Sequence, residues 1–206
     1  MPGTDQKIYL ASKSPRRREL LRQIGLEFEM LVLREGSGRD AAVSEVAYAG
    51  EAPENYVVRI AREKAHSGWN AVLARRLFPR PVLAADTTVT IDGHILGKPA
   101  NTEEAISMLK LLSGRTHQVM TAVAVIMDDK LDEVMQRSEV RFAVIDDVAL
   151  RAYCALHEPY DKAGSYAVQG YAAQFIEHIA GSYSGIMGLP LFETTQLLKR
   201  AGIKLL

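Results

Sequence analysis

The sequence predicts an α/β fold with a mixed β-sheet. Short apolar segments that favour strands alternate with segments of helical periodicity along the whole chain. The dipeptide Asp92-Gly93 lies between two β-favouring runs and predicts a hairpin, because both residues favour the positive φ that such turns need. Hairpins next to helix-linked strands indicate a sheet with parallel and antiparallel pairs.

The first elements are a strand, a helix and a second strand. Residues 7–11 are apolar and strand-like. Ser14 and Pro15 are typical of a helix start, and the helix is expected to end near residue 24, just before Gly25. Residues 27–32 alternate in polarity, which favours a strand.

The middle of the chain combines a long loop, a long helix and a hairpin. Residues 34–52 carry glycine, serine and charge without periodicity, which predicts a long, mobile loop. A helical spacing of apolar residues then begins near Pro53. The run "VLAA" predicts a buried strand that ends at Asp86, and "TVTI" and "HIL" form the arms of the hairpin.

The last third continues the alternation of helices and strands. Asn101 or Thr102 opens a helix with two glutamates in its first turn, and Gly114 follows its end. The remaining expected elements are two β-rich segments at 117–127 and 134–145, a helix at 147–157, a glycine-containing loop at 158–172, a strand at 173–179 and a helix from near Pro190 to just before Gly202.

Composition fits an ordinary globular protein and excludes broad classes of partner. The 206 residues are 48% hydrophobic, and 25 basic residues balance 25 acidic ones. A neutral chain lacks the broad basic surface of nucleic-acid or anionic-membrane binders, so neither partner is expected. The single cysteine, Cys154, excludes an intrachain disulfide and fits a reducing compartment. With no secretory pattern and no membrane-length apolar run, a cytoplasmic location is expected.

Three consecutive arginines, Arg16, Arg17 and Arg18, follow the predicted helix start. A helix N-terminus is already electropositive and is a ready site for anions. Additional cations there favour a bound polyanion such as phosphate. The alternative is a solvated basic face, and this stretch by itself does not decide between the two.

Other candidate residues also have structural alternatives. Asp86 could bind Mg²⁺ or polarise a water at the end of a strand, although an aspartate that caps a turn is the simpler interpretation of the local pattern. Lys64, Lys98 and Glu45 could all be solvated surface residues. Gln169 could contact a base edge or hold its own loop together. The histidines lack zinc-ligand spacing, and no glycine-rich phosphate motif occurs.

Six segments, taken together, resemble the Maf family of nucleoside triphosphate pyrophosphatases. They are "LASKSPRRRELL", "YVVRIAREKA", "AADTTVTIDGHILGKP", "LSGRTHQVMTAVAV", "DKAGSYAVQG" and "GSYSGIMGLPL", in the family's order and over nearly the whole chain. The resemblance implies one such domain over residues 1–206. It also implies an elongated mixed β-sheet with flanking helices and two lobes around a deep cleft, similar to the fold of the inosine triphosphate pyrophosphatases.

The activity that the resemblance implies is hydrolysis of a nucleoside triphosphate to the monophosphate and pyrophosphate, which removes unwanted nucleotides. A divalent cation, Mg²⁺ or Mn²⁺, is expected as cofactor. Family members are often dimeric, so a homodimer is one expectation. The alternative is a non-catalytic nucleotide-binding regulator of cell division, which would gain little from Asp86 close to the phosphates.

Residue by residue, the resemblance assigns Asp86 as proton acceptor and, with Glu45, as metal ligand. It assigns Ser12, Arg17, Lys64 and Lys98 to the phosphates of the substrate, and Arg16, Thr87 and Gln169 to the choice of base. The last three identities look like the dTTP/UTP subgroup, with modified pyrimidine nucleotides as further candidates. Glu45 departs from the family pattern, because Ser44 replaces its usual acidic neighbour.

Overall fold

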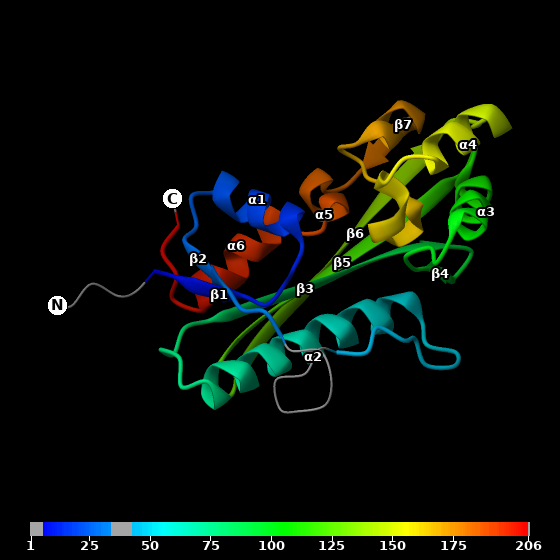
Figure 1. Ribbon diagram of the computed structural model, residues 1–206. Coiled ribbons are helices and arrows are strands. Elements are labelled where there is room, and N and C mark those ends of the chain that lie inside the picture. The colour runs from blue at the N-terminus through cyan, green and yellow to red at the C-terminus, as the bar shows by residue number, and fades with distance from the viewer. Residues whose placement is uncertain (1–5, 34–42, 206) are drawn as a thin grey trace.

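The structure is a computed structural model that describes residues 6–33 and 43–205. In this part of the chain, seven strands form one mixed sheet in the order β2-β1-β3-β5-β6-β7, with β4 beside β3 (Figure 1). The strands are β1 (Ile8–Leu10), β2 (Phe28–Met30), β3 (Val82–Ile91), β4 (His94–Leu96), β5 (Thr116–Met127), β6 (Lys130–Phe142) and β7 (Ile176–Ala180). The α-helices are α1 (Pro15–Gln23), α2 (Pro53–Ala74), α3 (Thr102–Leu112), α4 (Asp147–Cys154), α5 (Tyr183–Met187) and α6 (Leu191–Arg200).

The predicted α/β fold with a mixed sheet is confirmed. β1 runs parallel to both β2 and β3, whereas the pairs β3–β4, β3–β5, β5–β6 and β6–β7 are antiparallel. The hairpin at Asp92-Gly93 joins β3 to β4, and both turn residues have positive φ, 52° and 78°. The expected start of α1 is also confirmed, because the Ser14 side chain caps the helix and accepts the Arg17 amide hydrogen.

The central strand β3 has a gap along one of its two edges. β5 pairs with β3 along one edge, from Val82 to Thr90. On the other edge, β1 pairs at Val82 and Leu83, and β4 pairs only from Val89 onward. Among the described strands, residues 84–88 therefore have a partner on the β5 side alone, and the sheet is open between β1 and β4.

The core consists of three clusters that cover the sheet from different sides. One end of the sheet packs on α2 through one face, and on α1 and α6 through the other (Figure 1). Successive side chains of β3 point to opposite faces of the sheet, so Ala84 packs toward α2, whereas Leu83 and Ala85 pack toward α1 and α6. A third cluster joins the far ends of β3, β5 and β6 to α3 and α4. The gap in the sheet lies between these two ends of the molecule.

Two predictions of local structure were wrong, and one short helix was missed. The strand does not end at Asp86, because the β-branched Thr87 and Thr88 continue it to Ile91. The segment 158–172, expected as a loop, contains short 3₁₀ helices at Glu158–Asp161 and Ala163–Ser165. A third 3₁₀ helix, Tyr171–Phe175, begins at its end, so that β7 begins only at Ile176. Helix α5 was not predicted, since five residues are too few to show a helical period.

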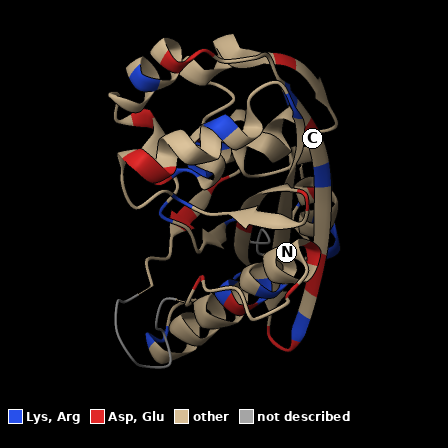
Figure 2. Cartoon of the chain, turned by 90° about the vertical axis from the view of Figure 1, so that its right-hand side faces the viewer, with Lys and Arg blue, Asp and Glu red and all other residues tan. Residues whose placement is uncertain are grey.

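Residues 34–42 of the expected mobile loop lie outside the described residues, and the remainder, 43–52, contains no helix or strand. Basic and acidic residues are mixed along the elements, and α2 carries both kinds (Figure 2). No helix in the described part of the chain is long and apolar enough to cross a membrane. Because basic and acidic residues are mixed along the elements, a site for an anion would have to come from a local group of side chains.

Candidate active site

A cavity of about 480 Å³ lies at the gap between β1 and β4. Its wall includes Asp86, whose side chain points to the α2 face of the sheet, and Thr87, which points to the α1 face. Lys64 from α2 and Arg17 from α1 line the same cavity from these two sides. Side chains from opposite faces of a sheet can share one cavity only where no strand separates them. The missing strand partner of residues 84–88 therefore creates the site.

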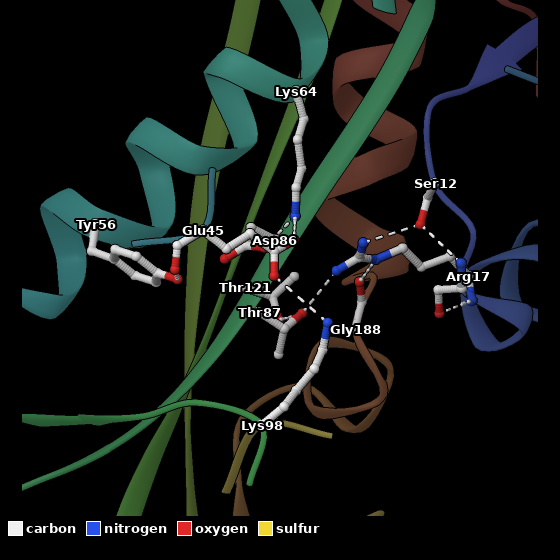
Figure 3. A network of polar contacts seen from close by, with 11 residues as sticks. Ser12, Arg17, Glu45, Tyr56, Lys64, Asp86, Thr87, Lys98, Thr121 and Gly188 are labelled. Carbon is white, nitrogen blue, oxygen red and sulfur yellow. Dashed lines mark hydrogen bonds and ion pairs between the residues drawn. The ribbon is translucent and has the colours of Figure 1, made fainter. Parts of the chain in front are cut away.

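The α2 side of the cavity holds two carboxylates around one ammonium group (Figure 3). Lys64 Nζ donates to Glu45 Oε1 at 2.5 Å and to Asp86 Oδ1 at 2.8 Å. Lys98, on the segment after β4, lies 3.6 Å from Glu45 Oε2 and has a side chain that is 59% exposed. Asp86 is only 7% exposed, so its charge is enclosed and needs this partner.

Arg17 is fixed on the other side of the gap by three hydrogen bonds (Figure 3). Its Nε donates to the Gly188 carbonyl at 2.7 Å, Nη1 donates to Ser12 Oγ at 3.2 Å, and Nη2 donates to Thr87 Oγ1 at 3.2 Å. Ser12 Oγ also accepts the Ser14 amide hydrogen. The guanidinium is therefore held at the cavity wall, next to the N-terminus of α1.

The charges of the site shift the pKa values of its members. Burial lowers the pKa of Arg17, and the negative charge of Asp86 partly offsets this effect. Burial raises the pKa of Glu45, but the charges and hydrogen bonds of Lys64 and Lys98 together outweigh burial and leave that pKa below its usual value. Burial, together with the charges of Asp86 and Glu45, raises the pKa of Tyr56 to about 12. At neutral pH the pocket thus keeps Glu45 ionised and Tyr56 protonated.

Helix α2 also fixes the main chain of the segment that carries Glu45. The Tyr56 hydroxyl donates to the Glu45 carbonyl at 3.1 Å. Arg59 donates twice to the Glu51 carboxylate, both times at 2.7 Å, and its guanidinium carbon lies 3.9 Å from the centre of the Tyr48 ring. These contacts hold a segment without regular structure against a rigid helix. They place the Glu45 side chain over the cavity.

The third part of the wall is the segment with the short 3₁₀ helices. It carries Gln169, which lines the cavity, and Asp161, which lies 3.7 Å from Arg16 Nη1. The Gly164 amide donates to the Gly97 carbonyl, which ties this segment to the one that carries Lys98. Apolar side chains of the α3–α4 cluster complete this end of the cavity, namely Val89, Val119, Tyr166, Val168 and Ile186.

The structure brings all the residues that sequence reasoning selected into one cavity. They are Ser12, Arg16, Arg17, Glu45, Lys64, Asp86, Thr87, Lys98 and Gln169. Sequence reasoning missed Tyr56, Arg59, Thr121 and Tyr166, as well as the Gly188 carbonyl. For Tyr56 and Arg59 one sequence signal was available, because both carry polar groups in the first two turns of the helix predicted to begin near Pro53.

The two carboxylates suit a divalent cation whose remaining coordination positions are filled by substrate and water. Among the described residues, no three His, Cys, Asp or Glu side chains gather closely enough to hold a metal ion by themselves. Glu45 and Asp86 both accept hydrogen bonds from the same Lys64 nitrogen, so their oxygens already face one shared positive charge. Mg²⁺ is usually held by one or two carboxylates together with substrate phosphates and water. The donor set present fits that pattern.

The fold and the site together define a class of protein. Cations and two carboxylates surround one end of the cavity, and an apolar surface forms the other end. Such a cavity suits an anionic ligand that also carries a flat, largely uncharged group. Comparison with known sequences makes the assignment specific. The model of the Maf-like protein family matches residues 7–201, and the chain belongs to this family.

Curated relatives cover the chain almost end to end. A protein named dTTP/UTP pyrophosphatase from Aromatoleum aromaticum is 53% identical over 206 residues, which is 100% of both chains. Proteins of the same name from Dechloromonas aromatica and Ralstonia nicotianae are 48% and 52% identical, and cover 96% of this chain and 98% and 95% of their own. Among solved structures, the Staphylococcus aureus Ham1 protein gives a TM-score of 0.48 at 13% identity, over 95% of this chain and 99% of that one.

Proposed function

We propose that this protein hydrolyses dTTP and UTP to the monophosphates and pyrophosphate. The observation that carries the proposal is the cavity that Arg17, Lys64 and Lys98 line together with Asp86, beside an apolar end. A triphosphate brings several negative charges to the cations, and a pyrimidine base brings a flat surface to the apolar end. Relatives that are 48–53% identical over nearly their whole length carry the name dTTP/UTP pyrophosphatase, which supports the same substrates here.

In this proposal the basic residues hold the phosphates and Asp86 handles the proton. Arg17, Lys64 and Lys98 stabilise the charge that develops on the leaving pyrophosphate. Asp86 accepts a proton from a water whose oxygen bonds to the α-phosphorus, while the bond from that phosphorus to the bridging oxygen breaks. Glu45 and Asp86 would hold Mg²⁺ or Mn²⁺, which supplies further neutralisation of phosphate charge when bound.

Base selection would use the opposite end of the cavity. The Gln169 amide offers both a donor and an acceptor, which matches the mixed edge of a uracil or thymine ring. Arg16 would be steadied by Asp161, which lies on the same segment as Gln169. A site that pairs with the edge of a base can reject wrong bases strongly, because mispairing leaves buried polar groups without partners. Modified pyrimidine nucleotides that keep this edge are further candidates, and their removal is the proposed biological role.

The test is hydrolysis by the purified protein of dTTP, UTP, CTP and GTP, with Mg²⁺ or Mn²⁺ and with the products separated. We expect release of pyrophosphate from dTTP and UTP, and slower turnover of the other two. Release of single phosphate, or a preference for GTP, would contradict the proposal. Nucleotide binding without any turnover would instead support the regulator of cell division considered from the sequence.

A further inference from the structure

Thr121 is a buried threonine whose hydroxyl joins the hydrogen-bond network of Arg17. It lies in β5 directly opposite Thr87 of β3 and has no exposed surface. The two hydroxyl oxygens are 2.9 Å apart, and Thr121 Oγ1 donates to the Gly185 carbonyl in α5 at 2.8 Å. Figure 3 shows Thr121 next to Thr87. The residue belongs to none of the roles described above.

The available protons give this chain of hydrogen bonds one direction. A threonine hydroxyl carries a single proton. Thr121 donates its proton to the Gly185 carbonyl, so it must accept the proton of Thr87. Thr87, having donated to Thr121, presents its lone pairs to Arg17 Nη2, 3.2 Å away. The order of donation runs from the guanidinium through two hydroxyls to the main chain of α5.

These hydrogen bonds determine which N–H donors of Arg17 remain available for a ligand. Arginine has five N–H groups. Bonds to the Gly188 carbonyl, Ser12 and Thr87 use three of them, one on each nitrogen. One N–H on each terminal nitrogen has no protein partner among the described residues. A phosphate can therefore accept two hydrogen bonds from a guanidinium whose orientation the protein has already fixed.

We propose that Thr121 is a positioning residue that orients Arg17 toward the phosphates through Thr87. The inference rests on the proposed function in one respect, namely that the ligand of Arg17 is a phosphate chain. Without the Thr121 hydroxyl, the Thr87 proton has no acceptor in β5. The Thr87 hydroxyl then turns to satisfy that proton elsewhere, and its oxygen no longer accepts from Arg17.

The experiment compares Thr121→Val with Thr121→Ser and with a matched control. Valine keeps the branched shape that suits a strand but has no hydroxyl, whereas serine keeps the hydroxyl. Thr90→Val is the control, because Thr90, in β3, is buried like Thr121 and its hydroxyl has no hydrogen-bond partner among the described residues. We expect Thr121→Val to lower kcat/KM for dTTP about 10- to 100-fold, the scale of one hydrogen bond to a charged group. Thr121→Ser should stay within about threefold of wild type, and Thr90→Val should match wild type.

A double-mutant cycle separates positioning from a general loss of structure. In an Arg17→Ala background, Thr121→Val should cost nothing further, because the residue that it orients is gone. An undiminished loss in that background, or full activity of Thr121→Val alone, would overturn the inference. If Thr121→Val does not fold, Thr121→Cys takes its place with the same expected result, because a thiol is a weak donor and acceptor.

Binding of inorganic pyrophosphate, measured by calorimetry, distinguishes failure of this inference from failure of the proposed function. A protein that binds pyrophosphate but does not hydrolyse dTTP contradicts the proposed function alone. The positioning role then still requires that Thr121→Val weaken pyrophosphate binding about tenfold or more in the Arg17 protein and not in the Arg17→Ala protein. Equal pyrophosphate affinity of wild type and Thr121→Val would overturn the positioning role by itself.

Discussion

Lys64 Nζ lies 2.8 Å from Asp86 Oδ1, so a lysine from α2 and an aspartate from β3 form an ion pair at the cavity wall. The same nitrogen lies 2.5 Å from Glu45 Oε1. One ammonium group therefore lies between the two carboxylates that are proposed to hold a divalent cation. Lys64 and that cation compete for the same oxygens, whereas Lys64 and the cation both attract the triphosphate.

This competition predicts opposite effects of Lys64→Met on metal and on nucleotide. Affinity for Mn²⁺ without nucleotide should rise at least about fivefold, because removing a like charge at this distance is worth more than about 1 kcal/mol even when solvent screens it. Affinity for a non-hydrolysable dTTP analogue should fall, because one phosphate partner is lost. Electron paramagnetic resonance of free Mn²⁺ measures the first quantity, and calorimetry measures the second.

Lys98→Met is the matched control for the metal measurement. Lys98 lies 3.6 Å from Glu45, has a largely exposed side chain, and forms no ion pair with Asp86 in the described part of the chain. Solvent screens such a charge, so its removal should change Mn²⁺ affinity less than removal of Lys64 does. Weaker binding of Mn²⁺ to Lys64→Met than to wild type would refute the idea that the lysine and the metal compete.

Asp86→Asn tests the proton acceptor. Asparagine keeps the size of the side chain and an oxygen that can accept from Lys64, so the fold and the thermal unfolding midpoint should change little. Turnover of dTTP should fall about 10²- to 10⁴-fold, the usual contribution of positioned proton transfer. Steady-state kinetics with circular dichroism as the folding check decides the matter, and near wild-type turnover would remove Asp86 from this role.

Arg59→Ala tests whether α2 holds Glu45 in place through the segment before it. Arg59 binds the Glu51 carboxylate at 2.7 Å through two nitrogens and donates to the Val46 carbonyl at 3.1 Å. Without these bonds the segment loosens, and the Mn²⁺ concentration for half-maximal activity should rise about 10-fold or more, as for other residues that support metal ligands. The measurement is a metal titration of dTTP turnover.

Arg62→Ala provides the comparison for Arg59→Ala. Arg62 lies on the same helix and also pairs with a glutamate, Glu133, through two nitrogens. That partner belongs to β6 and forms no hydrogen bond or ion pair with the Glu45 segment among the described residues, so metal dependence should match wild type. A similar loss in both variants would mean that α2 is merely destabilised and that Arg59 has no specific role.

Sequence reasoning could find the cations and acids of the site but not the opening that unites them. Strand and helix periodicity predicted most elements, and the Ser14-Pro15 start of α1 follows from local capping chemistry. The gap in the sheet depends on which strands pair with β3, and this is a non-local choice. The sequence interpretation therefore ended the strand at Asp86, whereas the strand continues and its neighbour is missing.

The network behind Arg17 was hidden for the same reason. Thr121 is an ordinary residue in a β-favouring run, and its role depends on facing Thr87 across a strand pair. The carbonyls of Gly185 and Gly188 are main-chain groups that any residue would supply, so residue type gives no signal. Charged side chains are recognisable from sequence, but the acceptors that orient them depend on the tertiary structure.

His117 predicts how stability depends on pH. It is 2% exposed, its Nε2 lies 2.8 Å from the Tyr166 hydroxyl, and its buried Nδ1 has no hydrogen-bond partner in the part of the chain that the structure describes. Burial lowers its pKa to about 4. Between this value and the ordinary histidine pKa, the unfolded chain binds a proton that the folded protein does not, so stability falls as pH falls through that range. At pH 4 the loss relative to pH 7.5 should reach about 3 kcal/mol from this residue.

The measurement is the free energy of unfolding in urea for wild type and His117→Gln from pH 4 to pH 7.5. Carboxylates also titrate in this range, so the informative quantity is the difference between the two pH profiles. Glutamine does not titrate and can still bond to the Tyr166 hydroxyl, so the His117→Gln profile should be flatter. His178→Gln removes an exposed histidine of β7 and should keep the full wild-type slope. Parallel profiles for wild type and His117→Gln would show that the buried imidazole does not control this pH dependence.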